Sequence, residues 1–571
     1  KGGLESLALA GWVPESDAAQ LYDHYRHHRE VEHRLQMIND AQTHSLPADD
    51  RGFARLAAFM GTDVNLLRRD LHKRLEAVHQ LTEGFFAPEA TATKASTDFG
   101  AEVISRWHSY PALRSSRATE IFARLQPEIL TRLQEAAKPE EALNQFDSFL
   151  SGLPAGVQLF SLFEANPSLT QLIVDICATA PALAQYLSRN AGVLDVVIGG
   201  SFFADWPGEA ALADELSATL ETYDDYEGQL LATRRWAREW HFRIGVHHLR
   251  GLIDAGEAGR QYADLAQAVL CALWPKVVGE FARKYGDPPG RGGCVLAMGS
   301  LGAGQLTAAS DLDLIMIYDP QGVEQSDGPR PLATRPYYAR LTQALVTALS
   351  APMAEGRLYE VDMRLRPSGR QGPVATALES FQVYQREEAW TWEHLALTRA
   401  RPIAGDPDLR AEIDALRAQI IAEKAEGVTI IADVADMRRR IADAKKGDGP
   451  FDPKVGRGRL QDIELFAQTA ALRAGVYTRD VAQQLQAGVA CSWLNAADAQ
   501  ALTEAGRLWW AMQATSRLLT GSGFPFADLA EGAKRMILRE TGAEDMAALQ
   551  DTLLRSETEA AGLIDGYLSA G

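Results

Sequence analysis

The chain has 571 residues, of which 46% are hydrophobic and 23% charged, which is typical of a globular protein with several domains. Its formal net charge of −19 argues against a nucleic-acid partner, because binding to a phosphate backbone needs a basic surface. A nucleotide substrate is still compatible with this charge, since a metal ion can supply local positive charge. The sequence has no run of about 18 uncharged apolar residues, so we expect no membrane span.

The cysteines and the first residues indicate the setting of the chain. Cys177, Cys271, Cys294 and Cys491 lie far apart and form no CxxC pair, which predicts buried, reduced thiols and a cytoplasmic location. The chain opens with "KGGLESLALAGW", without Met and without a signal pattern, so we expect a piece of a longer protein.

Helices are predicted for the first half of the chain. In residues 1–90, Leu21, Val31 and Leu35 recur at helical spacing between charged residues. A stretch rich in small and polar residues follows, and we place a linker at 91–117. Residues 118–285 return to helical periodicity and predict a helical regulatory or linking region.

The pattern changes from residue 286. "GGCVLAMGS" and "LDLIMIYD" are short apolar runs that favour strands, and "LYEVDMRLRP" alternates with period two. An amphipathic helix, "RPYYARLTQALVTALSAP", lies between the last two, so residues 286–405 predict an α+β domain. Helices resume in 406–571 as a C-terminal bundle. The predicted fold is therefore mostly α, with helical bundles flanking one small mixed sheet.

Two aspartates stand out in "GSLGAGQLTAASDLDLIMIYD", residues 299–319. In a strand, Asp311 and Asp313 point to the same face because side chains alternate. Two neighbouring carboxylates repel each other unless a divalent cation neutralises them. Hard oxygen ligands suit Mg²⁺, which binds through carboxylates and substrate phosphates.

A third carboxylate lies in the next predicted strand. Asp362 follows Asp313 by 49 residues, with the amphipathic helix between them, which is enough chain to return a strand beside the first. Three convergent carboxylates are what a two-metal phosphoryl-transfer site needs. We therefore predict Asp311, Asp313 and Asp362 as catalytic and metal-binding residues.

Phosphate contacts are predicted on either side of these acids. The turn at Gly299 and Ser300 leaves backbone N–H groups able to approach a phosphate, and Ser310 precedes the aspartate pair. No GK[ST] follows, so this is not a Walker A loop. Arg364 and Arg366 share strand-face parity with Asp362, so they either reach phosphate oxygens or pair with the aspartates.

These residues resemble the DNA-polymerase-β-type nucleotidyltransferase superfamily, which has a GS turn, a DxD strand and a later carboxylate strand. A closer resemblance, to the bifunctional glutamine synthetase adenylyltransferase/adenylyl-removing enzymes, is carried by five segments. They are "ASDLDLIMIYD", "LYEVDMRLRPSGRQGP", "YQREEAWTWEHLALTRARPIAGDP", "REVEHRLQMINDAQTHSLP" and "FDPKVGRGRLQDIELFAQ". The resemblance extends over nearly the whole chain.

The resemblance implies two nucleotidyltransferase modules in tandem in the full-length protein. One removes AMP from glutamine synthetase by phosphorolysis, and the other transfers AMP from ATP to a tyrosine of it and releases pyrophosphate. The "EAWTWEHLALTRAR" context resembles the transferase module, so transfer with ATP and Mg²⁺ is the expected activity. Removal of AMP by the same fold is the alternative, and a non-catalytic nucleotide-binding scaffold is a further one. A PII-type signalling protein and glutamine are the implied regulators.

The same resemblance assigns residues 1–90 to the end of the preceding adenylyl-removing module. "GWVPESDAAQL" at 11–21 is similar to "SWLNAADAQAL" at 492–502, which fits this assignment unless the similarity of two helix starts is chance.

Two departures from the family pattern concern the site. Residues 299–303 read GSLGA where the family commonly has GKLGG, so Ser300 stands in place of a lysine, and Arg459 stands where a paired glycine is usual. Lys454, Asp462 and Glu464 are expected to form a helix cap or ion pairs rather than to take part in catalysis.

Overall fold

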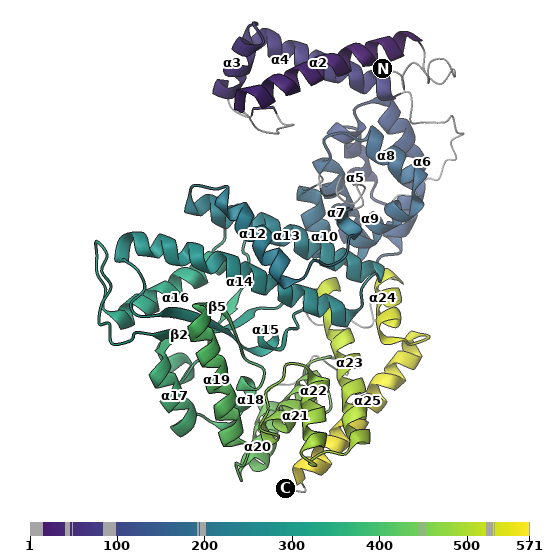
Figure 1. Ribbon diagram of the computed structural model, residues 1–571. Helices are drawn as coiled ribbons and strands as arrows, with labels where there is room; N and C mark the ends of the chain where they lie inside the picture. Colours follow the sequence, from purple (N-terminus) through teal and green to yellow (C-terminus); the bar gives the residue numbers. More distant parts are fainter. Residues whose placement is uncertain are drawn as a thin grey trace. The chain divides into compact units, whose positions relative to one another are not determined.

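A computed structural model describes residues 15–39, 46–47, 50–83, 99–190, 193, 201–444, 447, 449, 451–520, 529 and 531–569 (Figure 1). The chain divides into two compact units. Lys1–Arg132 and Leu150–Gln171 form the first unit, and Leu133–Phe149 and Leu172–Gly571 form the second.

Helices make up most of both units. Those before the sheet are α2 (Glu15–Asn39), α3 (Asp50–Phe59), α4 (Val64–Glu83), α5 (Ala101–Trp107), α6 (Ser116–Gln134), α7 (Pro139–Gly152), α8 (Val157–Ala165), α9 (Pro167–Thr179), α10 (Pro181–Arg189), α12 (Glu209–Glu221), α13 (Tyr226–Arg250) and α14 (Ala255–Tyr285). Those within and after the sheet region are α15 (Gly299–Ala303), α16 (Thr334–Ser350), α17 (Leu378–Glu387), α18 (Thr391–Leu397), α19 (Pro407–Lys424), α20 (Ile430–Ala444), α21 (Leu460–Arg473), α22 (Val481–Ala490), α23 (Ala496–Leu519), α24 (Glu531–Thr541) and α25 (Met546–Ser569). Short 3₁₀ turns lie at Pro111–Leu113, Ser201–Phe203 and Gly369–Gln371.

Helices α2, α3 and α4 of the first unit share a small apolar core. Val31 and Leu35 of α2 pack with Leu56 of α3 and with Leu67 and Leu71 of α4. These positions are three or four residues apart within each helix, so each helix presents one apolar face to the others.

The second unit contains a mixed sheet built from β1 (Gly292–Ala297), β2 (Leu312–Asp319), β3 (Val361–Asp362), β4 (Ala375–Ala377) and β5 (Arg401–Gly405). The strand order is β3-β2-β1-β5, and β4 also pairs with β2. β1 is antiparallel to β2 and β5, whereas β3 and β4 are parallel to β2. The parallel strand β3 needs a crossover connection, and α16 supplies it.

Alternation along β2 separates the core from the site. Leu312, Leu314, Met316 and Tyr318 belong to the core cluster that includes buried residues of α14 and α16. The odd-numbered positions, among them Asp313, therefore face away from that core.

Helix α14 is long and apolar enough to cross a membrane, yet 56% of its most apolar window is buried inside the protein. Its buried face supplies Leu265, Val269 and Leu273 to the core against the sheet. Asp254 starts the helix by accepting a hydrogen bond from the backbone N–H of Glu257 at 2.7 Å. Because α14 is buried in this way, its apolar composition is that of a core helix.

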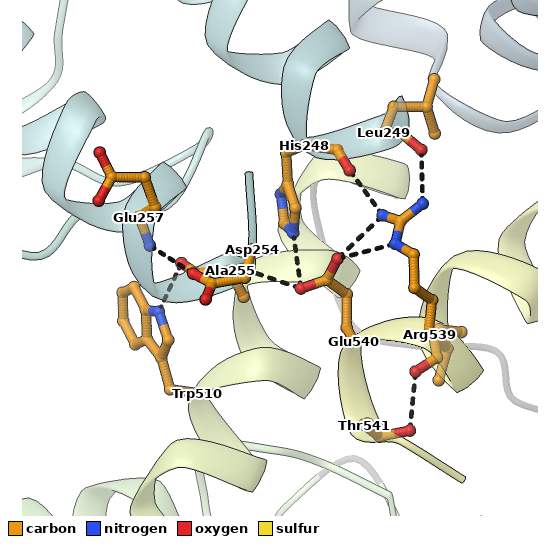
Figure 2. Close-up of polar contacts among 10 residues, drawn as sticks. His248, Leu249, Asp254, Ala255, Glu257, Trp510, Arg539, Glu540 and Thr541 are labelled. Atoms are coloured by element: carbon orange, nitrogen blue, oxygen red, sulfur yellow. Dashed lines mark hydrogen bonds and ion pairs between the residues drawn. The ribbon is translucent and has the colours of Figure 1, made fainter. Parts of the chain in front are cut away.

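The last helices hold the corner between α13 and α14 (Figure 2). Arg539 of α24 donates to the carbonyls of His248 (2.6 Å) and Leu249 (3.0 Å), which end α13. Glu540 accepts the backbone N–H of Ala255 at 2.8 Å and lies 3.5 Å from His248 Nε2. Trp510 of α23 donates its indole N–H to the Ala255 carbonyl at 2.9 Å. We call these six residues the α13–α14 clamp.

The predicted fold class, mostly helical with a small mixed sheet, is confirmed. Part of the predicted linker, residues 91–98, lies outside the described residues, and its remainder contains α5 and the start of α6. Strands β4 and β5 were not predicted. Both are short, and neither shows the alternation by which strands are recognised.

The cysteines differ from expectation in one place. Cys177 and Cys294 are buried and Cys271 is half-buried, but Cys491 is exposed, so the prediction of burial is wrong there. All four are free thiols, as predicted. Burial raises the pKa of Cys294 to about 12 and of Cys271 to about 11, so both stay protonated and unreactive at neutral pH.

Candidate active site

Asp313 and Asp362 meet at one edge of the sheet, whereas Asp311 directly precedes β2 and is exposed. Parallel pairing of β2 with β3 sets Asp313 directly beside Asp362, and Leu312 beside Val361. The backbone N–H of Leu312 donates to the Glu360 carbonyl at 2.9 Å and fixes this register. A separation of 49 residues in sequence thus becomes a direct neighbourhood in space.

The electrostatics of Asp313 show how close the three acids are. Burial, together with the negative charges of Asp311 and Asp362, raises the pKa of Asp313 to about 6, against the opposing effect of Arg399 and Lys454. A carboxylate placed in this way repels its neighbours and stabilises any cation brought to it.

Asp313 lines a cavity of about 310 Å³, which we call the Asp313 cavity. Its wall includes three residues predicted to contact the nucleotide, Gly299, Ser300 and Ser310. Helices α18, α21 and α23 contribute Trp392, Glu464, Gln468 and Trp510, among others. Sheet and C-terminal helices therefore enclose the cavity together.

The glycine-serine turn lies against Asp313. Gly299 opens the short helix α15 at φ 54°, and a Cβ there would stand 2.0 Å from Asp313 Oδ2. The backbone N–H of Met298 donates to the Asp313 carbonyl at 2.9 Å. Arg401 of β5 donates to the carbonyls of Leu301 and Gly302, both at 3.0 Å, and so holds the end of α15. The turn is fixed from both sides.

We expect Gly299→Ala to reduce catalysis by about tenfold or more, because the added methyl group displaces the Asp313 carboxylate. Gly304→Ala is the matched control. Gly304 ends the same helix at φ 73°, but the nearest atom to its Cβ would be Arg479 Nη1 at 4.0 Å. Both variants carry backbone strain of about 1–2 kcal/mol. Turnover assays alongside thermal unfolding separate the two effects, and equal losses of activity would contradict the steric argument.

The two predicted arginines meet the expectation in part, because Arg364 pairs with Asp362 but the strand ends before either arginine. β3 ends at Asp362, so Arg364 and Arg366 do not share a strand face with it, and the parity argument is wrong. The Asp362 carboxylate accepts the backbone N–H of Arg364 at 2.8 Å, which turns the chain at once. Arg364 Nε also donates to Asp362 at 2.6 Å. Arg366 donates to the carbonyls of Met363 and Gly372.

This pairing sets the charge of Asp362. Burial alone would raise the pKa of Asp362, but the two hydrogen bonds from Arg364 outweigh it and hold the pKa below the ordinary value. Asp362 is therefore ionised at neutral pH. The Asp362 side chain is only 14% exposed and that of Arg364 is 64% exposed, so the guanidinium is the solvent-facing partner of the two.

Comparison with known proteins bears directly on this site. Residues 170–416, which include the whole sheet, match the glutamate-ammonia ligase adenylyltransferase family. The bifunctional glutamine synthetase adenylyltransferase/adenylyl-removing enzyme of Brucella suis biovar 1 (strain 1330) is 38% identical over 583 residues, covering 96% of this chain and 59% of that protein. The protein of the same name from Mesorhizobium japonicum is 37% identical over 604 residues, covering 100% of this chain and 61% of that protein.

The chain is thus similar to glutamine synthetase adenylyltransferases over nearly its whole length. It spans 59–61% of the length of the curated relatives named above. Residues 2–86 match a second family, described as GlnD PII-uridylyltransferase. The resemblance drawn from the sequence motifs is thereby confirmed.

Two cationic residues of this site differ from the sequence analysis: Arg399 was not singled out, and Lys454 was expected to form a helix cap or an ion pair but lines the cavity. Lys454 lines the Asp313 cavity and lowers the pKa of Asp313, as does Arg399. Arg399 also lies 3.5 Å from Glu464 across the cavity wall. The sequence signal was the glycine-punctuated "FDPKVGRG" loop, whose position 141 residues after Asp313 gave no reason to connect the two.

The loop that carries Lys454 is held by Arg459. This side chain is 7% exposed and donates to the carbonyls of Gly449, Asp452 and Val455. The family usually has glycine at this position, and here the arginine stabilises the loop through these three hydrogen bonds. Asp462 forms an ion pair with Arg438 at 2.5 Å, in agreement with the expected structural role.

The donor set suits a magnesium ion in its chemistry. Three carboxylates supply hard oxygen ligands. The raised pKa of Asp313 shows that its ionised form is disfavoured there, and a bound cation would stabilise that form. Within the described residues, however, no group of three or more His, Cys, Asp or Glu side chains is arranged to hold a metal ion.

Proposed function

We propose that this chain transfers AMP from ATP to a tyrosine of glutamine synthetase, with release of pyrophosphate, and so regulates nitrogen assimilation. The observation that carries the proposal is the parallel pairing of Asp313 with Asp362, beside Asp311 and at the wall of a cavity with two cationic side chains. Similarity to the adenylyltransferase family supports the reaction class, and the relatives' printed names supply glutamine synthetase as the target.

In this proposal the Asp313 cavity holds the nucleotide. Gly299, Ser300 and Ser310 contact the phosphates, and Lys454 and Arg399 offset their negative charge. Trp392, which is 36% exposed, offers an apolar surface for the adenine ring. Lys454 thereby takes the part of the lysine that is absent from the glycine-serine turn.

The chemical step is an in-line displacement at the α-phosphorus. The tyrosine oxygen forms a bond to phosphorus as the bond to the bridging oxygen breaks, and pyrophosphate leaves with that electron pair. Ionised Asp362 accepts the hydroxyl proton of the tyrosine. Mg²⁺ held by Asp311, Asp313 and Asp362 would stabilise the negative charge on the phosphates. Once Arg364 has turned outward, its guanidinium is within reach of a phosphate oxygen, while Arg366 keeps the 363–372 turn in place.

Incubation with ATP labelled at the α-phosphate and unmodified glutamine synthetase tests the proposal. We expect label on a tyrosine of the synthetase and one pyrophosphate released for each label transferred. Adenylylated synthetase with inorganic phosphate is the second arm of the assay. Release of ADP in that arm with no transfer in the first would assign this chain to AMP removal, and nucleotide binding without turnover in either arm would show a scaffold.

We expect Lys454→Gln to raise the KM for ATP by about tenfold or more, because it removes a positive charge from the phosphate-binding wall. Lys534→Gln, at an exposed position that pairs with Glu531, is the control and leaves KM unchanged. Initial-rate kinetics at saturating glutamine synthetase measure both. An unchanged KM in Lys454→Gln would remove this residue from the nucleotide site.

Regulation and location complete the proposal. A PII-type signalling protein and glutamine are the proposed regulators, and the match of residues 2–86 to a PII-uridylyltransferase family supports a link to that signalling system. The cytoplasm is the proposed compartment, in keeping with four free cysteines.

A further inference from the structure

A second cavity, of about 680 Å³, lies next to the Asp313 cavity. Helices α10, α13, α14 and α23 line it, together with the loop 306–311 and residues 357–360. Four arginines face two carboxylates in its wall. The arginines are Arg189, Arg238, Arg357 and Arg517, and the carboxylates are Asp311 and Glu360. We call it the Arg238 cavity.

Two polar groups of this wall have no partner within the described part of the chain. Arg238 is half-buried and makes no hydrogen bond or ion pair there, although its guanidinium lies against Gly356. Tyr262 is 4% exposed, and its buried hydroxyl is unpaired. Leaving a buried hydroxyl and a half-buried guanidinium without partners is unfavourable, and an anion can satisfy both. Glu360 pairs with Arg357, so its charge is already offset.

The remaining wall has the composition of a small-molecule site. Leu183, Phe242, Leu306 and Leu358 supply apolar surface around the arginines. A cavity of this volume, mostly apolar with a few converging polar groups, is the usual form of a metabolite pocket. Arginine is the residue best suited to recognise carboxylate or phosphate in such a setting.

One loop separates the two cavities. Thr307 and Ser310 line both of them, and Asp311 follows directly. His241 Nε2 donates to the Ala308 carbonyl at 2.9 Å, and the backbone N–H of Leu306 donates to the Gly259 carbonyl at 3.0 Å. Burial lowers the pKa of His241, so the ring is neutral when it makes this bond. A ligand beside His241 therefore contacts a side chain that holds the loop 306–311 in place.

We propose that the Arg238 cavity binds a small anion carrying a carboxylate or a phosphate, and that its occupation alters nucleotide affinity through residues 307–310. Binding of the anion is independent of the proposed function. Only the coupling rests on that function, because it needs the Asp313 cavity to hold ATP. By thermodynamic linkage, the anion and the nucleotide change each other's affinity by the same factor.

Calorimetric titration of the full chain with succinate and with inorganic phosphate, separately and at constant ionic strength, tests the binding. Succinate probes a carboxylate source and phosphate a phosphate source. We expect saturable binding of at least one probe, weakened about tenfold or more in Arg238→Gln and in Arg517→Gln. Arg235→Gln is the control, because Arg235 lies on the same helix, is 62% exposed and pairs with Glu355 outside the cavity. It retains wild-type affinity.

Further arms make the result decisive. Circular dichroism and thermal unfolding without ligand confirm that the variants are folded, and Tyr262→Phe provides a cavity variant that keeps its shape. Binding that survives in Arg238→Gln and Arg517→Gln but is lost in Lys454→Gln would place the anion in the Asp313 cavity and overturn the proposal. Absence of binding by both probes would overturn it as well. Anion binding with no change in ATP affinity would overturn the coupling. The binding test itself does not depend on ATP hydrolysis or on AMP transfer.

Discussion

Asp313→Asn is expected to lower AMP transfer by about a thousandfold, which corresponds to roughly 4 kcal/mol of lost transition-state stabilisation. The Asn amide has the shape of the carboxylate beside Gly299, but it carries no negative charge with which to bind a cation. Transfer of label from ATP to glutamine synthetase measures the loss. Asp319→Asn, at the far end of the same strand and paired with Arg291, is the matched control and should retain activity.

The same substitution is expected to leave the fold as stable as before or more stable. The pKa of Asp313 is raised from 3.8 to about 6, so its ionised form is disfavoured in the folded chain by burial and by two like charges. Removing that charge should raise the free energy of unfolding at pH 7 by about 1–3 kcal/mol. Urea unfolding measures this. An inactive variant that is also strongly destabilised would indicate a structural role for Asp313 instead of a catalytic one.

Glu540→Gln is expected to have the largest effect on stability, lowering the free energy of unfolding by about 3 kcal/mol. The Glu540 side chain is 4% exposed and contacts His248, Arg539 and the backbone N–H of Ala255 (Figure 2). Without its charge, the buried His248 ring, the Arg539 guanidinium and the Ala255 N–H lose a charged acceptor. Glu531→Gln, on the same helix but exposed, should leave stability unchanged, and equal effects in the two variants would contradict the clamp.

The effect of Glu540→Gln should depend on pH. Burial alone would raise the pKa of Glu540, but hydrogen bonds from His248, Arg539 and Ala255 outweigh it and hold the pKa below the ordinary 4.5. The stabilisation is therefore complete above about pH 4.5 and is lost as the pH falls through the lower, folded-state pKa. Unfolding curves of wild type and variant should differ fully at pH 7 and converge in acid.

The acidic half of the candidate site could be predicted from the sequence, because local patterns report on it. Alternation in "LDLIMIYD" sets the face of Asp313, and the helix between the strands gives a crossover that returns Asp362 to its side. The glycine-serine turn is likewise local. Each of these inferences needed fewer than about 70 consecutive residues.

The cationic half could not be predicted, because tertiary packing alone brings it in. Lys454 belongs to a loop after α20, and no periodicity relates that loop to β2. The end of β3 was missed because Asp362 competes for the backbone N–H of Arg364, a side-chain interaction that overrides alternation. The same holds for the α13–α14 clamp, whose members are ordinary helix residues until the helices meet.

The clamp also bears on how the protein is made. Ala255 and Glu540 are 285 residues apart, so at common rates of synthesis the α13–α14 corner waits roughly 15–60 s for its partner to leave the ribosome. During that interval Trp510, which lines the Asp313 cavity and binds the Ala255 carbonyl, is also missing or newly made. Contacts of such long sequence separation form late and slowly. A nascent chain therefore acquires its sheet before the last part of the Asp313 cavity wall, so a translation product that ends before α23 would lack Trp510 in that wall.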